Sequence, residues 1–273
     1  MLCGASMDLP FSRPRKRFGQ NFLHDRTVIE RIVKELEISP ATTLLEIGPG
    51  RGALTRRLLE RVEHAVAVEI DRDLAARLRD AFPETRLHVI EEDILKLDFA
   101  RLGRVVHQRA VRWTVAGNLP YNISKPIAMR LVESVASIER AVLMFQREVA
   151  QRLCAGPGGA DYGPLSILPR AVYAIDRVMD VPPGAFRPRP KVVSTITHWR
   201  ARSERPSTDE LALLRATLRA AFSNRRKTLR NNVRRALGSE RVLAQAGLDG
   251  ARRPQELSPE EFHALAAFWP KAS

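Results

Sequence analysis

The chain has 273 residues, of which 44% are hydrophobic, enough to build one large domain or one domain with a small appendage. Its formal net charge is +14, and its 38 arginines far outnumber its 7 lysines, which favours a polyanionic partner such as a nucleic acid. Two cysteines exclude a disulfide framework or a zinc site, and no apolar run reaches the roughly 18 residues of a membrane span, so we expect a cytoplasmic protein without a metal or membrane partner.

The N-terminal part of the sequence contains three different kinds of segment. Residues 1–17 are expected to form a flexible leader that ends in a basic run. Residues 18–23, with the sequence Phe-Gly-Gln-Asn-Phe-Leu, are unusual for a core and are interpreted as a lid. Apolar residues at helical spacing then predict a helix over residues 28–36, with Asp25 as its N-cap.

From residue 43 onwards, short apolar segments alternate with amphipathic ones. Five buried strands are predicted, at 43–47, 64–70, 86–90, a segment that ends at Asn118, and 141–145. Most of them are followed by a predicted helix, and Asp71 and Ser124 are expected to be N-caps of two of these helices. The alternation predicts right-handed βαβ units and a parallel sheet that is covered on both faces.

The pattern changes in the second half of the chain. A loop rich in Gly and Pro, 155–164, precedes a predicted helix at 165–171 and two extended segments, 172–180 and 192–199. Their connection is too short for a crossover helix, so we expect them to pair antiparallel. A polar hinge at 203–207 then precedes about three helices, which divides the chain into a catalytic domain, 18–202, and a helical RNA-contacting domain, 203–273.

Glycine and acidic residues follow three successive predicted strands. Gly48, Gly50 and Gly52 lie between the first strand and a helix, where glycine lets the backbone approach a ligand. Glu69 ends the second strand and suits the hydroxyls of a ribose, while Asp93 follows the third strand and suits an adenine amine. The set predicts a nucleoside cofactor. A nicotinamide dehydrogenase is an alternative, although no constellation for hydride transfer is evident.

Residues 118–121, Asn-Leu-Pro-Tyr, end the fourth predicted strand and offer acceptors for an aromatic amine. The side-chain carbonyl of Asn118 and the backbone carbonyl of Leu119, whose direction Pro120 fixes, would accept from that amine. Two acceptors favour a pyramidal nitrogen with an exposed lone pair and stabilise the positive charge that grows on it. With the ring of Tyr121 against the base, the motif predicts N-methylation of a base that has left its stack.

Further residues are expected to hold the substrate. Phe186, on the proline-rich loop between the last two strands, is expected to form the wall opposite Tyr121, the alternative being a hydrophobic plug. Basic side chains are expected to hold phosphates, namely Arg187, Arg189, Lys191, Arg225, Arg226, Lys227, Arg230 and Arg234.

Six motifs occur in an order that resembles the ribosomal RNA adenine N6,N6-dimethyltransferases. They cover residues 18–235 and are Gly-Gln-Asn-Phe-Leu (19–23), Glu-Ile-Gly-Pro-Gly-x-Gly-x-Leu-Thr (46–55), Val-Glu-Ile-Asp (68–71), Asn-Leu-Pro-Tyr (118–121), Phe-x-Pro-x-Pro-Lys-Val (186–192) and Arg-Arg-Lys-Thr-Leu-Arg-Asn (225–231). The resemblance implies a class I S-adenosylmethionine-dependent fold. That fold has a mostly parallel seven-stranded sheet with an antiparallel last strand and a small helical C-terminal domain.

The resemblance also implies roles for individual residues. The residues of the S-adenosylmethionine site would be Asn21, Leu23, Gly48, Gly50, Glu69, Asp93 and Asn118. Asn118 and Leu119 would hold the target amine, and Tyr121 and Phe186 would sandwich the base. The chain is closer to the bacterial small-subunit branch, which dimethylates two adjacent adenines near the 3′ end of 16S rRNA in an immature subunit. We expect it to act as a monomer.

Two segments depart from the family pattern, and two further functions stay open. The loop at 155–164 is unusually rich in glycine, and residues 100–110 are interpreted as a variable insertion. A non-catalytic RNA-binding assembly factor would keep the same fold, and a DNA adenine methylase would use a similar strand-end motif. The intact set of Gly48, Glu69, Asp93 and Asn118 argues against the non-catalytic alternative.

Overall fold

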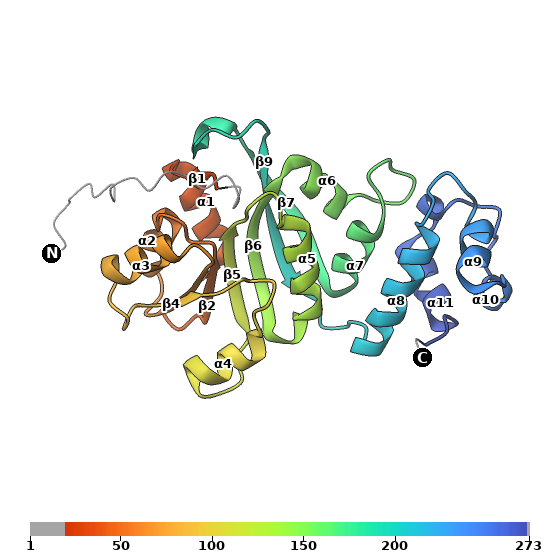
Figure 1. The fold of residues 1–273 in the computed structure, drawn as a ribbon, viewed down its shortest axis with the longest axis horizontal. Coiled ribbons are helices and arrows are strands. Elements are labelled where there is room, and N and C mark those ends of the chain that lie inside the picture. The colour runs from red at the N-terminus through yellow and green to blue at the C-terminus, as the bar shows by residue number, and fades with distance from the viewer. Residues whose placement is uncertain (1–19, 272–273) are drawn as a thin grey trace.

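The computed structural model describes residues 20–271, so the predicted leader at 1–17 lies outside the described residues. A seven-stranded sheet has the order β4-β3-β2-β5-β6-β9-β7 (Figure 1). β9 pairs antiparallel with both of its neighbours, whereas the other pairs are parallel. The predicted antiparallel last strand is confirmed, and it lies inside the sheet rather than at its edge. The strands are β2 (Leu44–Ile47), β3 (Ala65–Glu69), β4 (Leu87–Glu91), β5 (Trp113–Asn118), β6 (Ile138–Gln146), β7 (Tyr173–Val181) and β9 (Ser194–Ala201).

Helices cover both faces of this sheet, as the buried strands predicted. Successive side chains of a strand point to opposite faces: Leu45 and Ile47 pack in a cluster with residues of α4 to α7, whereas Leu44 packs with α1 to α3. The helices of this part are α1 (Arg26–Leu36), α2 (Ala53–Leu59), α3 (Arg72–Ala81), α4 (Phe99–His107), α5 (Ser124–Glu133), α6 (Arg147–Cys154) and α7 (Pro164–Val172), with the short 3₁₀ turns η2 (Val135–Ser137) and η3 (Pro183–Ala185).

Two of the three predicted N-caps are confirmed. The Asp25 side chain accepts a hydrogen bond from Val28 N, and the Asp71 side chain accepts one from Asp73 N. The prediction for Ser124 was wrong, because Ile123 is the N-cap of α5. The Ser124 hydroxyl instead donates to the backbone carbonyl of Tyr121 at 3.1 Å, and so ties the start of the helix to the preceding loop.

Residues 100–110, interpreted from the sequence as an insertion, belong largely to α4. Asp98 caps this helix by accepting from two backbone N–H groups. Phe99 and Leu102 are buried in the main core, and Trp113 Nε1 donates to the Phe99 carbonyl at 3.0 Å. The segment is therefore an integral part of the fold.

A second sheet has only two strands, β1 (Phe22–Leu23) and β8 (Phe186–Arg187), which pair antiparallel. His24 N extends the pairing by donating to the Ala185 carbonyl at 3.0 Å. This sheet joins the segment before α1 to the proline-rich connection between β7 and β9, and Figure 1 shows β1 next to that connection. The pairing fixes the position of the segment that the sequence analysis interpreted as a lid.

The C-terminal helices form a third hydrophobic cluster, which also includes Ile167 and Leu168 of α7. Gly158 N donates to the Gln255 carbonyl at 2.7 Å, so the glycine-rich loop is attached to this helical part. Within residues 20–271, no helix has the length and apolar character needed to cross a membrane. The elements are α8 (Thr208–Ala221), α9 (Leu229–Leu237), α10 (Arg241–Gln245), η4 (Pro254–Glu256) and α11 (Pro259–Ala267).

Candidate functional site

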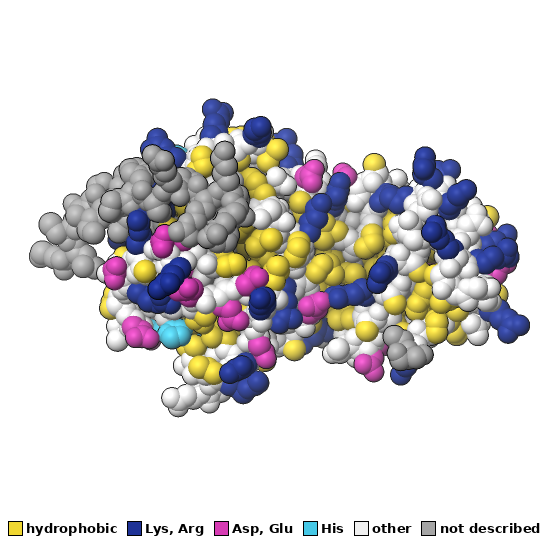
Figure 2. Space-filling model, in the orientation of Figure 1, with side chains coloured by type: hydrophobic (Ala, Val, Ile, Leu, Met, Phe, Trp, Pro, Cys, Tyr) yellow, Lys and Arg dark blue, Asp and Glu magenta, His cyan; other side chains and the backbone are white. Residues whose placement is uncertain are grey.

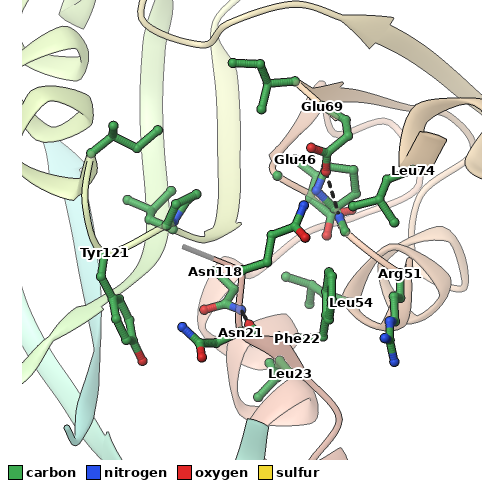
Figure 3. A pocket seen from close by; sticks show the side chains of 18 of the residues that line it. Asn21, Phe22, Leu23, Glu46, Arg51, Leu54, Glu69, Leu74, Asn118 and Tyr121 are labelled. Carbon is green, nitrogen blue, oxygen red and sulfur yellow. Dashed lines mark hydrogen bonds between the residues drawn. The ribbon is translucent and has the colours of Figure 1, made fainter. Parts of the chain in front are cut away.

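A cavity of about 270 Å³ lies at the carboxyl ends of β2, β3, β4 and β5, where open α/β sheets bind their ligands. The structure brings together around it every residue predicted to bind the cofactor and four of the five predicted for the target base (Figure 3). These residues are Asn21, Leu23, Gly48, Gly50, Glu69, Asp93, Asn118, Leu119, Pro120 and Tyr121.

The glycine loop after β2 packs closely against β1. Gly50 has a φ of +59°, and a Cβ atom added there would lie 3.0 Å from Cδ1 of Phe22. Its backbone N–H donates to Glu69 Oε2 at 3.1 Å, which holds the loop against the end of β3. Only glycine combines the positive φ with this close approach, so the backbone itself forms part of the cavity wall.

Glu69 ends β3 and has a side chain that is almost fully buried. Burial raises the pKa of its carboxyl, against the lowering effect of hydrogen bonds from the backbone N–H groups of Asp71 and Gly50. Each carboxylate oxygen has a second lone pair for a further donor. The position in the cavity therefore suits the predicted contact with ribose hydroxyls.

Asp93 lies two residues beyond β4 rather than at its end. Its Oδ1 accepts from Leu95 N at 3.0 Å, so Asp93 shapes a turn. The residue also lines the cavity. The turn and the ligand-facing role are therefore compatible, since a carboxylate has two oxygens.

The side chain of Asn118 is fixed at the end of β5. Its Nδ2 donates to the backbone carbonyl of Asn21 at 2.8 Å (Figure 3). An amide whose NH₂ group is bound in this way presents its carbonyl oxygen as the acceptor in the cavity. Gly117, the preceding residue, allows the tight approach of β2, because a Cβ there would lie 3.0 Å from the Ile47 carbonyl oxygen.

Tyr121 lies on the side of the cavity away from Glu69 (Figure 3). Its Oη is 2.6 Å from Oγ of Ser194, the first residue of β9. Burial raises the pKa of the Tyr121 phenol, and the hydrogen bond with Ser194 lowers it by a smaller amount. The phenol is therefore a neutral hydrogen-bonding group at physiological pH. The sequence analysis did not identify Ser194.

Phe186 does not line the cavity, so its prediction as the opposite wall of the base pocket is not met in this structure. Its side chain is 3% exposed and packs in a cluster with Leu23, Val181 and Ala185. It lies opposite Leu23 in the β1–β8 pairing. The apolar surroundings supplied by β1 make Phe186 a hydrophobic plug, which was the alternative interpretation.

Glu46 is a cavity residue to which the sequence analysis gave no role. It lies in β2, is 2% exposed, and accepts a hydrogen bond of 2.6 Å from Thr55 Oγ1. Burial raises the pKa of Glu46 to about 8; the Thr55 bond opposes this shift and the charge of Glu69 adds to it. A single carboxylate inside the apolar strand Leu-Leu-Glu-Ile was the signal that could have identified it.

The segment 20–22 crosses the cavity and contacts three of its sides. Gln20 Nε2 donates to Asp71 Oδ2 at 3.0 Å, and the guanidinium of Arg51 lies 4.4 Å from the ring centroid of Phe22. Together with the bond from Asn118 to Asn21, these contacts hold the segment against β3, the glycine loop and β5. The predicted lid is therefore present in a closed position.

The predicted phosphate-binding residues lie in two separate places. Arg187, Arg189 and Lys191 are exposed on the connection that leads to β9, whereas residues 225–230 lie between α8 and α9. Figure 2 shows Lys and Arg side chains over both regions. Arg225 has a structural role in addition, because it donates to the carbonyls of Ala160 and Tyr162 at 2.9 and 2.6 Å.

Comparisons with known proteins identify relatives of the whole chain. The profile of the family described as ribosomal RNA adenine dimethylase matches residues 11–271. The ribosomal RNA small subunit methyltransferase A of Aromatoleum aromaticum is 44% identical over 258 residues, or 94% of each chain. The protein of the same name from Syntrophotalea carbinolica is 46% identical over 93% of this chain and 96% of its own. The crystal structure of the 23S rRNA methyltransferase ErmE is similar, with a TM-score of 0.67 and 27% identity over 90% of this chain and 98% of its own.

These matches agree with the fold. The relatives match over nearly their full length, and the similar crystal structure covers the sheet and the helical part. The family profile extends from before β1 to beyond α11, so it includes the glycine loop and the end of β5. The chain belongs to the ribosomal RNA adenine dimethylase family.

Proposed function

We propose that this chain transfers methyl groups from S-adenosylmethionine to N6 of adenine in ribosomal RNA, twice on each base. The observation that carries the proposal is the fixed amide of Asn118, at the junction between the nucleoside cavity and Tyr121. Membership of the adenine dimethylase family supports the same reaction.

The cavity residues fit S-adenosylmethionine by their chemistry. The carboxylates of Glu69 and Asp93 suit ribose hydroxyls and an adenine amine, while Ile70 and Leu95 offer apolar contact to a flat ring. Glu46 suits the positively charged methionine end, because a nearby cation favours its ionised form. When bound, the cofactor supplies an activated methyl group.

The residues at the end of β5 prepare the target nitrogen. The side-chain carbonyl of Asn118 and the backbone carbonyl of Leu119 accept the two hydrogens of the adenine amine. This draws the lone pair out of conjugation and stabilises the positive charge that grows on nitrogen during transfer. The proton leaves after transfer, so no side chain has to act as a base. The ring of Tyr121 stacks against the flipped base and fixes its plane.

The substrate of this proposal is a pair of adjacent adenines near the 3′ end of 16S rRNA in an immature small subunit, and the reaction takes place in the cytoplasm with a monomeric enzyme. The names of the curated relatives and the net charge of +14 support an RNA of the small subunit. We also propose that residues 18–202 form the catalytic domain and that residues 203–273 form a domain that contacts RNA.

The test is incubation with labelled S-adenosylmethionine and immature small subunits, followed by mass spectrometry of the rRNA nucleosides. The expected product is N6,N6-dimethyladenosine. Added duplex DNA should leave the transfer unchanged. Absence of transfer to any ribosomal RNA, or preferential methylation of the DNA, would overturn the proposal.

A further inference from the structure

The hydroxyl groups of Tyr121 and Ser194 meet at 2.6 Å, although 73 positions separate the two residues in the chain. Tyr121 lies in the turn between β5 and α5, and Ser194 begins β9. β6 lies between β5 and β9 in the sheet, so this side-chain contact bridges two strands that are not neighbours. It needs an explanation, because the backbone pairing of the sheet does not require it.

Ser194 is a rigid anchor. Its side chain is fully buried, and its backbone pairs with Gln146 of β6 on one side and with Val181 of β7 on the other. A residue held by ladders on both sides has little freedom to move. Tyr121, by contrast, is half-buried and lies in a turn, where the backbone alone gives a side chain less support.

We propose that Ser194 is a positioning residue for methyl transfer, which holds the ring of Tyr121 in the plane that the target base stacks against. The inference rests on the proposed function. The ring is attached at two ends: the Tyr121 carbonyl accepts from the Ser124 hydroxyl at 3.1 Å, and the phenol is bound to Ser194. A bond at Oη, the atom farthest from the backbone, fixes the χ1 direction of the side chain and leaves the stacking faces of the ring uncovered.

The same contact defines what the Tyr121 hydroxyl does. A phenol bound at 2.6 Å to a buried hydroxyl keeps its proton within that pair and is not available as a base for the amine. The contribution of Tyr121 to the reaction is therefore geometric. Since transfer needs close alignment of nitrogen and methyl group, a wall that tilts reduces the rate of the chemical step more than it reduces RNA binding.

The experiment compares Ser194→Ala, Tyr121→Phe and the double variant in single-substrate kinetics with immature small subunits. Each single variant should lower kcat about three- to tenfold with little change in KM, because one neutral hydrogen bond is lost. The double variant should be no slower than the slower single variant, because both remove the same bond. Additive losses would overturn the proposal.

A matched control separates positioning from stability. Tyr173 is a second buried tyrosine, whose hydroxyl donates to the Leu131 carbonyl at 2.9 Å, and it does not line the cavity. Tyr173→Phe should lower Tm and leave kcat unchanged when the assay is run well below Tm. If Ser194→Ala lowers Tm but keeps the kcat of the unchanged enzyme, Ser194 is only structural. If the unchanged enzyme itself transfers no methyl group to rRNA, the proposed function has failed instead.

Discussion

The Asn118 side chain donates to the backbone carbonyl of Asn21 at 2.8 Å, which joins the end of β5 to the segment before α1. This bond settles which end of the Asn118 amide faces the cavity. It also means that the acceptor for the target amine is oriented by a segment that closes over the cofactor side. Cofactor site and base site therefore share one hydrogen bond.

The first prediction concerns Asn118→Ala. We expect kcat to fall on the order of 100-fold, because one of two acceptors for the developing charge is lost. The Kd for immature small subunits should change by less than about twofold, since binding rests on many phosphate contacts. Equal losses in transfer and in RNA binding would mean that residues 118–121 are scaffold.

Asn118→Asp tests the orientation of this amide. Aspartate keeps the acceptor oxygens but has no N–H for the Asn21 carbonyl, and its charge would repel that oxygen. We therefore expect Asn118→Asp to lose activity as Asn118→Ala does. Activity near that of the unchanged enzyme would contradict the assigned orientation.

Gly50→Ala should weaken both folding and cofactor binding. The new Cβ would be strained at a φ of +59° and would press on Phe22, at a cost of about 1–3 kcal/mol in the free energy of unfolding. Gly156→Ala is the matched control, because a Cβ at Gly156 meets no atom within 4 Å. Urea denaturation and calorimetric titration with S-adenosylmethionine measure the two effects. Equal behaviour of both variants would refute the close packing of β1 on the glycine loop.

The buried carboxyl of Glu46 predicts a dependence of stability on pH. Its pKa is raised from 4.5 to about 8, so between these values the folded protein binds more protons than the unfolded chain. The contribution of Glu46 to the free energy of unfolding is therefore greatest below pH 4.5 and falls as the pH rises towards 8. Glu46→Gln stays neutral and can still accept from Thr55.

Urea denaturation of both proteins at pH 6, 7 and 8 measures this effect. The free energy of unfolding of the unchanged protein should fall relative to Glu46→Gln by up to about 1.4 kcal/mol per pH unit. A difference that stays constant with pH would show that Glu46 is ionised throughout this range.

Phe186→Ala distinguishes a plug from a wall of the base pocket. As a buried residue of the core, Phe186 should cost about 3–5 kcal/mol of unfolding free energy when truncated. Phe268, which is 44% exposed, offers a control truncation of the same size with a much smaller effect. A variant of Phe186 with unchanged stability and a large loss of kcat would restore the prediction that it stacks on the base.

Adjacent arginines should separate RNA contact from structure. Arg226→Ala removes an exposed cation and should weaken RNA binding and reduce its salt dependence, by about 0.7 to 0.9 in the slope of log K against log salt for each phosphate lost. Arg225→Ala also removes the bonds to Ala160 and Tyr162, so it should lower Tm in addition. Filter binding at several salt concentrations and thermal melts would show the difference, and identical melts would contradict the structural role of Arg225.

The sequence predicted the parallel sheet because its signals are local. Short apolar strands, the glycine loop and the cap at Asp71 each act within a few residues, and their order determines a βαβ fold. Gly48, Glu69 and Asp93 could be assembled into one site for the same reason, since the carboxyl ends of parallel strands meet at one edge of the sheet.

The parts that the sequence did not predict depend on distant contacts. β1 and β8 have two residues each, too few for a periodic pattern, and their pairing decides whether Phe186 faces the cavity or the core. The hydrogen bond between Tyr121 and Ser194 likewise depends on the order of the strands. Ser124 failed as a predicted cap because the Tyr121 carbonyl is a competing partner for its hydroxyl.

The place of β9 between β6 and β7 has a consequence for synthesis on the ribosome. β7 leaves the ribosome before β9, yet it lies at the edge of the sheet with β9 as its neighbour. Until residues 194–201 emerge, the nascent chain has no strand to connect β7 to the sheet, and the edge of β6 stays open. The completed base site, in which Ser194 meets Tyr121, is thus among the last parts of the catalytic sheet to form.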